Sequence, residues 1–136
     1  MNIAFFLKPK ISLSFIYSDF TMRQAMEKMR RCGYTAVPVI GRDGKYAGTV
    51  SEGDFLWFFS DCLKNNSELS QKMLEEIPVQ RIMRREAYKP VSVTANVDEL
   101  LNVSLNQNFV PVVDDLGSFI GIVTRRDIIK HLISEQ

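Results

Sequence analysis

The sequence is poor in the residues that build metal centres and disulfide frameworks. Its 136 residues include one histidine and two cysteines. Cys32 and Cys62 lie far apart with no metal-ligand spacing around them, which predicts two reduced thiols that behave as small apolar side chains. His131 likewise has no partner at metal-ligand spacing, and the sequence contains neither a P-loop nor a definable catalytic triad. These absences predict a protein that holds no metal and is not an enzyme.

Long hydrophobic runs and an excess of one charge are also missing. The start, residues 1–7, has no cationic region, and Phe55–Phe59 is far below the roughly 18 apolar residues that a membrane span needs. The 17 basic and 16 acidic residues leave a net charge of +1, which gives no general attraction to nucleic acid or acidic membranes. We therefore expect a cytoplasmic protein without nucleic-acid or membrane partners, in which any anion site is local.

What the sequence does contain is a repeat. Val37–Ile40 reappears as Val110–Val113, and further residues recur at the same offset. The matched pairs are Gly44 and Gly117, Gly48 and Gly121, Val50 and Val123, Ser51 and Thr124, and Asp54 and Asp127. The repeat predicts two copies of one unit, residues 1–61 and 78–136, joined by a helical insert at 62–77.

Each copy is expected to fold in the order strand, helix, strand, strand, helix. Apolar, β-branched residues predict strands at 37–40 and 110–113, and after turn residues further strands at 46–50 and 119–123. Shorter extended stretches are expected around 12–17 and 88–93. A glycine lies inside each second strand, which indicates a bulge or a close approach of backbone or ligand.

Capping residues predict where the helices begin. Thr21 with Gln24 and Asn96 with Glu99 form the expected caps, and the methionines after Thr21 follow helical spacing, which favours core packing over a ligand surface. The insert is expected to be a polar break at 64–67 and a short amphipathic helix before Pro78.

The last helices of the two copies differ in composition. Residues 55–59 are apolar nearly all round, which predicts burial on more than one side. The counterpart in the second copy keeps Lys130 and His131 for solvent.

Several of these segments match one known pattern. They are Gly33–Ile40, Asp43-Gly44 and Gly48–Asp54 in the first copy, and Phe109–Val113, Gly117 and Gly121–Asp127 in the second. With them the chain resembles the tandem CBS domain, also called a Bateman module. Arg81–Arg84 resembles the motif that leads into a repeat, and Phe6–Pro9 is its weaker counterpart. The resemblance implies an α/β (α+β) fold of two pseudo-symmetric βαββα repeats, packed sheet to sheet with two clefts between them.

The resemblance also implies a regulatory role. CBS pairs commonly bind an adenosine-containing nucleotide: AMP, ADP, ATP, S-adenosylmethionine or cyclic di-AMP. The nucleotide is then a regulatory ligand and not a catalytic cofactor. Because the two repeats account for the length, a stand-alone module is expected to signal to a separate effector protein. The alternative is a structural or dimerisation scaffold whose clefts are vestigial and bind no nucleotide.

The family's ligand motif, Gly-x-x-Ser/Thr-x-x-Asp, occurs in both copies. By resemblance, Asp54 and Asp127 accept hydrogen bonds from ribose hydroxyls, and Ser51 and Thr124 contact ribose or phosphate. The same spacing is nearly a capping box, so helix capping without a ligand is the alternative, and the two roles are compatible.

Adenine is expected against the start of the strand that carries the proline. The residues are Tyr34, Thr35, Ala36 and Pro38 in the first copy and Asn108, Phe109, Val110 and Pro111 in the second. For the two aromatic residues, plain core packing is the alternative to stacking on a base.

Charge distinguishes the two motifs. Arg125 and Arg126 lie in a first helical turn, where the helix dipole disfavours cations by roughly 0.3–1 kcal/mol unless an anion is present. The first copy has Glu52 instead, which would repel phosphate unless Lys8 or Lys10 compensates. We therefore expect the second copy to take the more highly charged ligand, the alternative being two solvated arginines. Further candidates to reach phosphate are Arg84, Arg85 and Lys89.

A homodimer is also expected. In the family, the helices equivalent to 54–59 commonly form the dimer face, which makes Trp57 and Phe58 candidate anchors.

Overall fold

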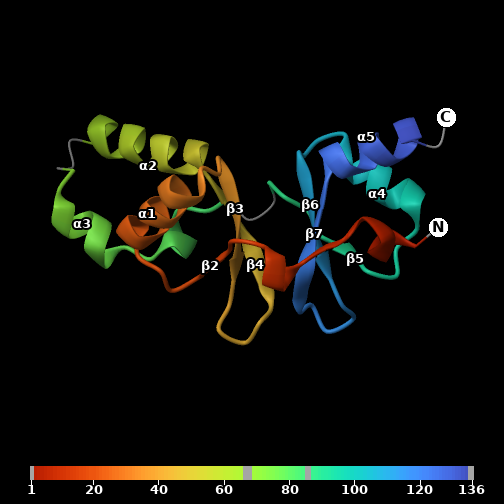
Figure 1. Ribbon diagram of the computed structural model, residues 1–136. Helices are drawn as coiled ribbons and strands as arrows, with labels where there is room; N and C mark the ends of the chain where they lie inside the picture. Colours follow the sequence, from red (N-terminus) through yellow and green to blue (C-terminus); the bar gives the residue numbers. More distant parts are fainter. Residues whose placement is uncertain (1, 66–68, 85–86, 135–136) are drawn as a thin grey trace. The chain divides into compact units, whose positions relative to one another are not determined.

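The computed structural model describes residues 2–65, 69–84 and 87–134, and Figure 1 shows their course. Asn66 and Ser67 of the expected polar break, and the phosphate candidate Arg85, lie outside the described residues. The chain divides into two compact units. One contains residues 14–42, 47–65 and 69–84 together with Ala87, and the other contains residues 2–13, 43–46 and 88–134.

The first unit holds the first repeat and the insert. Its elements follow the predicted order strand, helix, strand, strand, helix: β2 (Ile16–Tyr17), α1 (Met22–Cys32), β3 (Ala36–Ile40), β4 (Tyr46–Ser51, of which Tyr46 is grouped with the other unit) and α2 (Glu52–Lys64). They are followed by α3 (Gln71–Glu76) and the 3-10 helix η3 (Val79–Arg81). The sheet order is β2-β3-β4, with β2 parallel to β3. Figure 1 shows α1, α2 and α3 gathered beside this sheet.

The second unit holds the second repeat and the start of the chain. Its elements are η1 (Ile3–Phe6), β1 (Lys8–Pro9), η2 (Lys10–Ser12), β5 (Val91–Ser92), α4 (Val97–Ser104), β6 (Phe109–Val113), β7 (Phe119–Thr124) and α5 (Arg125–Ser134). The sheet order is β1-β7-β6-β5. The start of the chain runs antiparallel beside β7, with Lys8 opposite Ile122 and Pro9 opposite Gly121 (Figure 1).

The predicted caps position the first helix of each repeat. The Thr21 side chain accepts from the Gln24 backbone N–H at 3.2 Å, and the Gln24 side chain accepts in return from the Thr21 N–H at 2.9 Å. Asn96 Oδ1 accepts from the Glu99 N–H at 2.8 Å. Gly33 ends α1 in the left-handed conformation, φ 71°, which glycine adopts without steric cost.

Each unit has its own apolar core. The first is built around Ile16, Met22, Ala25, Met29, Val37, Val39, Val50, Phe55, Val79, Ile82 and Met83. The second is built around Ile3, Phe6, Val91, Leu100, Val110, Val112, Val123 and Ile128. The methionine face of α1 is therefore core, as predicted, except that Met26 is half exposed.

The two strand glycines mark close approaches. A Cβ on Gly121 would lie 2.1 Å from the carbonyl oxygen of Lys8, so only glycine lets β1 lie beside β7. A Cβ on Gly48 would lie 3.1 Å from the methyl group of Met83. The register between β6 and β7 also shifts at Val112 and Val113, so an irregularity lies beside the close approach.

Two expectations about the closing helices are wrong. Leu56, Trp57 and Leu63 of α2 are each more than half exposed, so this helix is not buried on more than one side within the described chain. In α5, His131 is not left to solvent: its ring meets Phe5 and Phe6 edge-on, with ring centroids 4.9 and 5.1 Å apart, because η1 packs there.

No helix in the described ranges is long and apolar enough to cross a bilayer.

Candidate functional site

In each repeat the ligand motif lies where the last strand runs into the last helix. Ser51 ends β4 and is the N-cap of α2, and Thr124 ends β7 directly before α5. The first helical N–H donates to the expected adenine stretch: Glu52 N–H to the Thr35 carbonyl and Arg125 N–H to the Asn108 carbonyl, both at 2.9 Å. The fold therefore brings the two halves of each predicted site together.

The motif of the first repeat forms a closed capping box. Ser51 Oγ accepts from the Asp54 N–H at 3.3 Å, and Asp54 Oδ2 accepts from the Ser51 N–H at 2.9 Å. The other carboxylate oxygen, Oδ1, accepts from Arg84 Nε at 2.9 Å. The Asp54 side chain is only 1% exposed. Both of its oxygens are therefore engaged inside the unit.

The motif of the second repeat is more open. Thr124 Oγ1 accepts from the Asp127 N–H at 3.1 Å. Within the described part of the chain, the partner of the Asp127 carboxylate is Lys8, whose Nζ lies 3.7 Å from Oδ2. The Asp127 side chain is 29% exposed. This carboxylate can therefore accept hydrogen bonds from a molecule outside the chain.

The cations beside the two motifs come from the segments that lead into the repeats. Lys8, expected to compensate Glu52 of the first copy, instead pairs with Asp127, because the start of the chain forms β1 against β7. Arg84 takes the matching place beside Asp54. Sequence reasoning missed this assignment, although the resemblance between Phe6–Pro9 and Arg81–Arg84 was a signal for it.

The two arginines at the start of α5 have different surroundings. Arg125 Nε donates to the carbonyl of Ser104, the last residue of α4, at 3.0 Å. A cation is stabilising at the C-terminal end of a helix, so no anion is needed to explain Arg125. Arg126 is exposed. Of the pair, Arg126 is thus the one left to meet a ligand.

The adenine stretches also differ between the repeats. Tyr34 and Thr35 are exposed, whereas Phe109 is buried and stacks on Tyr88 with ring centroids 4.8 Å apart. The Tyr88 hydroxyl donates to Asn108 Oδ1 at 3.2 Å. Core packing is therefore the role of Phe109. Three further predicted residues, Pro38, Val110 and Pro111, have buried side chains and offer a ligand their backbone alone, while Ala36 is half-buried.

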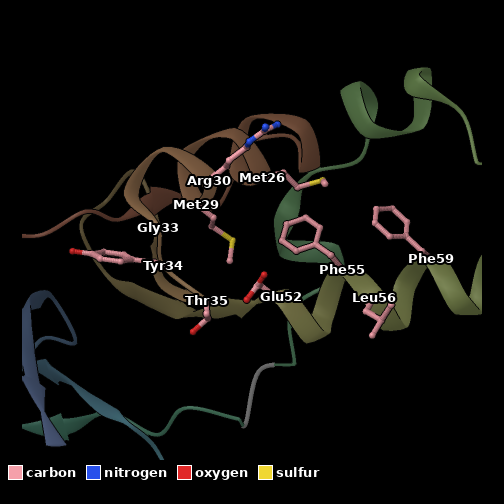
Figure 2. A pocket seen from close by; sticks show the side chains of 10 residues that line it. All are labelled: Met26, Met29, Arg30, Gly33, Tyr34, Thr35, Glu52, Phe55, Leu56 and Phe59. Carbon is pink, nitrogen blue, oxygen red and sulfur yellow. The ribbon is translucent and has the colours of Figure 1, made fainter. Parts of the chain in front are cut away.

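A cavity of about 460 Å³ lies between α1 and α2 of the first unit (Figure 2). It is lined by Met26, Met29, Arg30, Gly33, Tyr34, Thr35, Glu52, Phe55, Leu56 and Phe59. Figure 2 shows the Tyr34 ring pointing away from the two helices. The cavity thus includes Tyr34 and Thr35 of the predicted site but not the motif residues Ser51 and Asp54, and its charged groups are Arg30 and Glu52.

In the ranges that the structure describes, no cluster of three or more His, Cys, Asp or Glu side chains is placed to hold a metal ion. Cys62 is buried, Cys32 is half-buried, and both are free thiols.

Comparison with known proteins agrees with this geometry. The chain matches the family model described as CBS domain over residues 10–61 and 79–134. A CBS domain-containing protein of Dictyostelium discoideum is 30% identical, over 90% of this chain and 86% of its own.

Among solved structures, CbpB in complex with c-di-AMP superposes with a TM-score of 0.87 at 22% identity, covering 98% of this chain and 85% of that one. CBSX2 in complex with AMP has a TM-score of 0.76 at 22% identity, covering 98% and 96%. Matched twice by the family model and sharing the fold of these structures, the chain belongs to the CBS domain family as a tandem pair.

Proposed function

We propose that this chain binds an adenosine-containing nucleotide as a regulatory ligand, at the start of α5 in the second repeat, and signals its presence to a separate protein. The observation that carries the proposal is the Asp127 carboxylate, 29% exposed at the start of α5 with Lys8 beside it. The fold shared with CbpB, solved with c-di-AMP, and CBSX2, solved with AMP, supports the class of ligand.

The chemistry of the second repeat suits such a ligand. A carboxylate has enough acceptor positions for the two neighbouring hydroxyls of a ribose, which is the role proposed for Asp127. Lys8 and Arg126 supply positive charge for phosphate, and the dipole at the start of α5 favours an anion. Thr124 already holds the Asp127 N–H and contributes its hydroxyl. The adenine would lie along Asn108–Phe109, read by backbone groups.

The first repeat is the weaker candidate. Asp54 is nearly inaccessible, and Glu52 at the start of α2 repels phosphate. We therefore expect Asp127 to decide nucleotide binding and Asp54 to matter chiefly for stability, since Asp54 completes the capping box with Ser51 and a helix cap contributes about 0.5–2 kcal/mol.

A thermal-shift panel tests the proposal with AMP, ADP, ATP, S-adenosylmethionine and cyclic di-AMP. A ligand at 100 times its Kd stabilises the folded state by about 2.7 kcal/mol, enough to raise Tm by several degrees. We expect at least one nucleotide to do so, and expect Asp127→Ala to abolish the increase. Asp54→Ala lowers Tm without ligand but keeps most of the increase, and Asp98→Ala, in the first turn of α4, is the control. The reverse ranking of Asp127 and Asp54 would overturn the proposal.

A scaffold without a ligand is the second candidate function. The exposed apolar side chains of α2 and α5 favour it, because such faces mark contacts between proteins. They equally fit a nucleotide-binding homodimer, which is the form we propose. If no adenine nucleotide in the panel raises Tm, the scaffold is the better description.

A further inference from the structure

In the first repeat, a side chain of the protein already occupies the acceptor that a ribose would use. Asp54 Oδ1 accepts from Arg84 Nε at 2.9 Å, and Oδ2 is held by the Ser51 N–H. We propose that Arg84 is an internal gate: it closes the first repeat to nucleotide, so that the chain binds one nucleotide and not two. The inference rests on the function proposed above and names the residue that makes the two repeats unequal.

The gate competes well with a ligand because of its chemistry. A hydrogen bond between a guanidinium and a carboxylate is charge-assisted and roughly twice as strong as one between neutral groups. The hydroxyls of a ribose are neutral donors. Arg84 is also part of the chain, so its contact with Asp54 does not pay the translational and rotational entropy that binding a free nucleotide pays.

The position of Arg84 covers the start of α2 as well as the carboxylate. A Cβ on Gly53 would lie 3.9 Å from Arg84 Nη2, so the guanidinium extends over the first turn of the helix. The helix dipole disfavours a cation there, so Asp54, and not the helix, holds Arg84 in place. The arginine therefore takes the space beside Ser51 and Gly53 that a phosphate or ribose would need.

The second repeat has the same arrangement in a looser form. Lys8, the counterpart of Arg84, lies 3.7 Å from Asp127, against 2.9 Å between Arg84 and Asp54. Both cations are largely exposed, but the Asp127 side chain is 29% exposed and the Asp54 side chain only 1%. An ammonium group is a single point charge on a flexible stem, whereas a guanidinium presents a rigid fork of donors. Lys8 can therefore turn to a phosphate while Asp127 accepts the ribose. The presence of an arginine beside Asp54 and a lysine beside Asp127 thus decides which repeat can bind nucleotide.

Titration calorimetry with AMP tests the gate in the full chain. We expect one AMP per chain for the wild type and two for Arg84→Gln, the second being lost again in Arg84→Gln with Asp54→Asn. Arg84→Lys should also gain the second AMP, more weakly, and it keeps the charge should Arg84→Gln fold poorly. Arg81→Gln removes an exposed arginine of the same segment and should bind one AMP, as the wild type does.

The outcomes separate the gate from the proposed function. Two AMP per wild-type chain, or a single AMP in both Arg84 variants, overturns the gate and leaves nucleotide binding standing. A third outcome is possible: the wild type binds no AMP, Arg84→Gln binds one, and Arg84→Gln with Asp54→Asn binds none. That result supports the gate and overturns the assignment of the nucleotide site to the second repeat. If neither the wild type nor any variant binds AMP, both the gate and the proposed nucleotide site are overturned for AMP.

Discussion

At the scale of single residues, Arg42 is held by two partners of the first repeat. Its Nε and Nη2 donate to the two carboxylate oxygens of Asp19 at 3.0 and 3.1 Å, and its guanidinium lies 3.9 Å from the centroid of the Tyr17 ring. The hydrogen bond from Arg42 lowers the pKa of Asp19 below its usual value, with the charge of Arg42 acting in the same direction. The pair thus joins the turn after β2 to the loop after β3.

The lowered pKa of Asp19 fixes the direction in which folding stability changes with pH. A depressed carboxyl pKa contributes stability above the unfolded pKa of about 3.9, and this stability is lost as the pH falls through the folded pKa. Both side chains are exposed, so the contribution is small and the titration of Asp19 itself is the better measurement.

We predict that Arg42→Gln raises the pKa of Asp19 back toward its ordinary value, because the substitution removes both the charge and the fork of donors. Carbon-detected NMR of the Asp19 carboxyl, titrated from pH 7 to pH 2, measures the change. Arg31→Gln, at an exposed position near the end of α1, should leave the Asp19 titration unchanged. Identical curves for the wild type and Arg42→Gln would contradict the prediction.

At the scale of elements, β1 is held by β7 and depends on a single glycine. Gly121 and Gly48 are equivalent positions of the repeat with similar backbone conformations, φ 158° and 145°. Their neighbours differ: backbone atoms of Lys8 at Gly121, and the end of the flexible Met83 side chain at Gly48. A side chain at Gly121 must push β1 away, whereas one at Gly48 displaces a methyl group.

We therefore predict that Gly121→Ala destabilises the protein by about 1–3 kcal/mol more than Gly48→Ala, the range typical of overpacking that the backbone must absorb. Urea denaturation measures both, and because the backbone strain of the two positions is similar, Gly48→Ala is the matched control. Hydrogen exchange at β7 should become faster in Gly121→Ala alone. Equal losses in the two variants would show that strain, and not the contact with β1, sets the cost.

The elements that could be predicted are those with a local signal. Period and composition predicted β3, β4, β6 and β7, and capping residues predicted α1 and α4, because these signals lie within the segments themselves. β1 has two residues and no such signal, since its pairing with β7 is a tertiary contact. The ion pairs Lys8–Asp127 and Arg84–Asp54 depend on such contacts. From charge, the sequence therefore predicted both motifs and a preference for the second, but not the two ion pairs or the difference in exposure between Asp54 and Asp127.

At the scale of the whole molecule, the last helices of both repeats expose apolar side chains. Leu56 and Trp57 of α2 are 65% and 57% exposed, and Ile129, Leu132 and Ile133 of α5 are about half exposed or more. Phe58, the other expected anchor, is half-buried against the core of its own unit, so Trp57 remains. Water-exposed apolar faces of this kind mark association surfaces, and the repeat places one on the last helix of each copy.

We predict that a second copy of this chain covers the α2 face. In a twofold dimer the same patch meets itself, so opposite charges on one patch can pair across the axis. The cavity between α1 and α2 carries such a pair, Arg30 and Glu52, around an apolar interior that includes Leu56 (Figure 2).

We therefore predict a dimer at micromolar concentration in sedimentation velocity. Trp57→Asp should weaken it at least about 30-fold, the loss of about 2 kcal/mol expected of a central aromatic anchor. Leu105→Asp, at the exposed C-cap of α4, should leave the dimer intact. A monomeric wild type, or a Trp57→Asp protein that still dimerises as tightly, would show that another surface or another protein covers these helices.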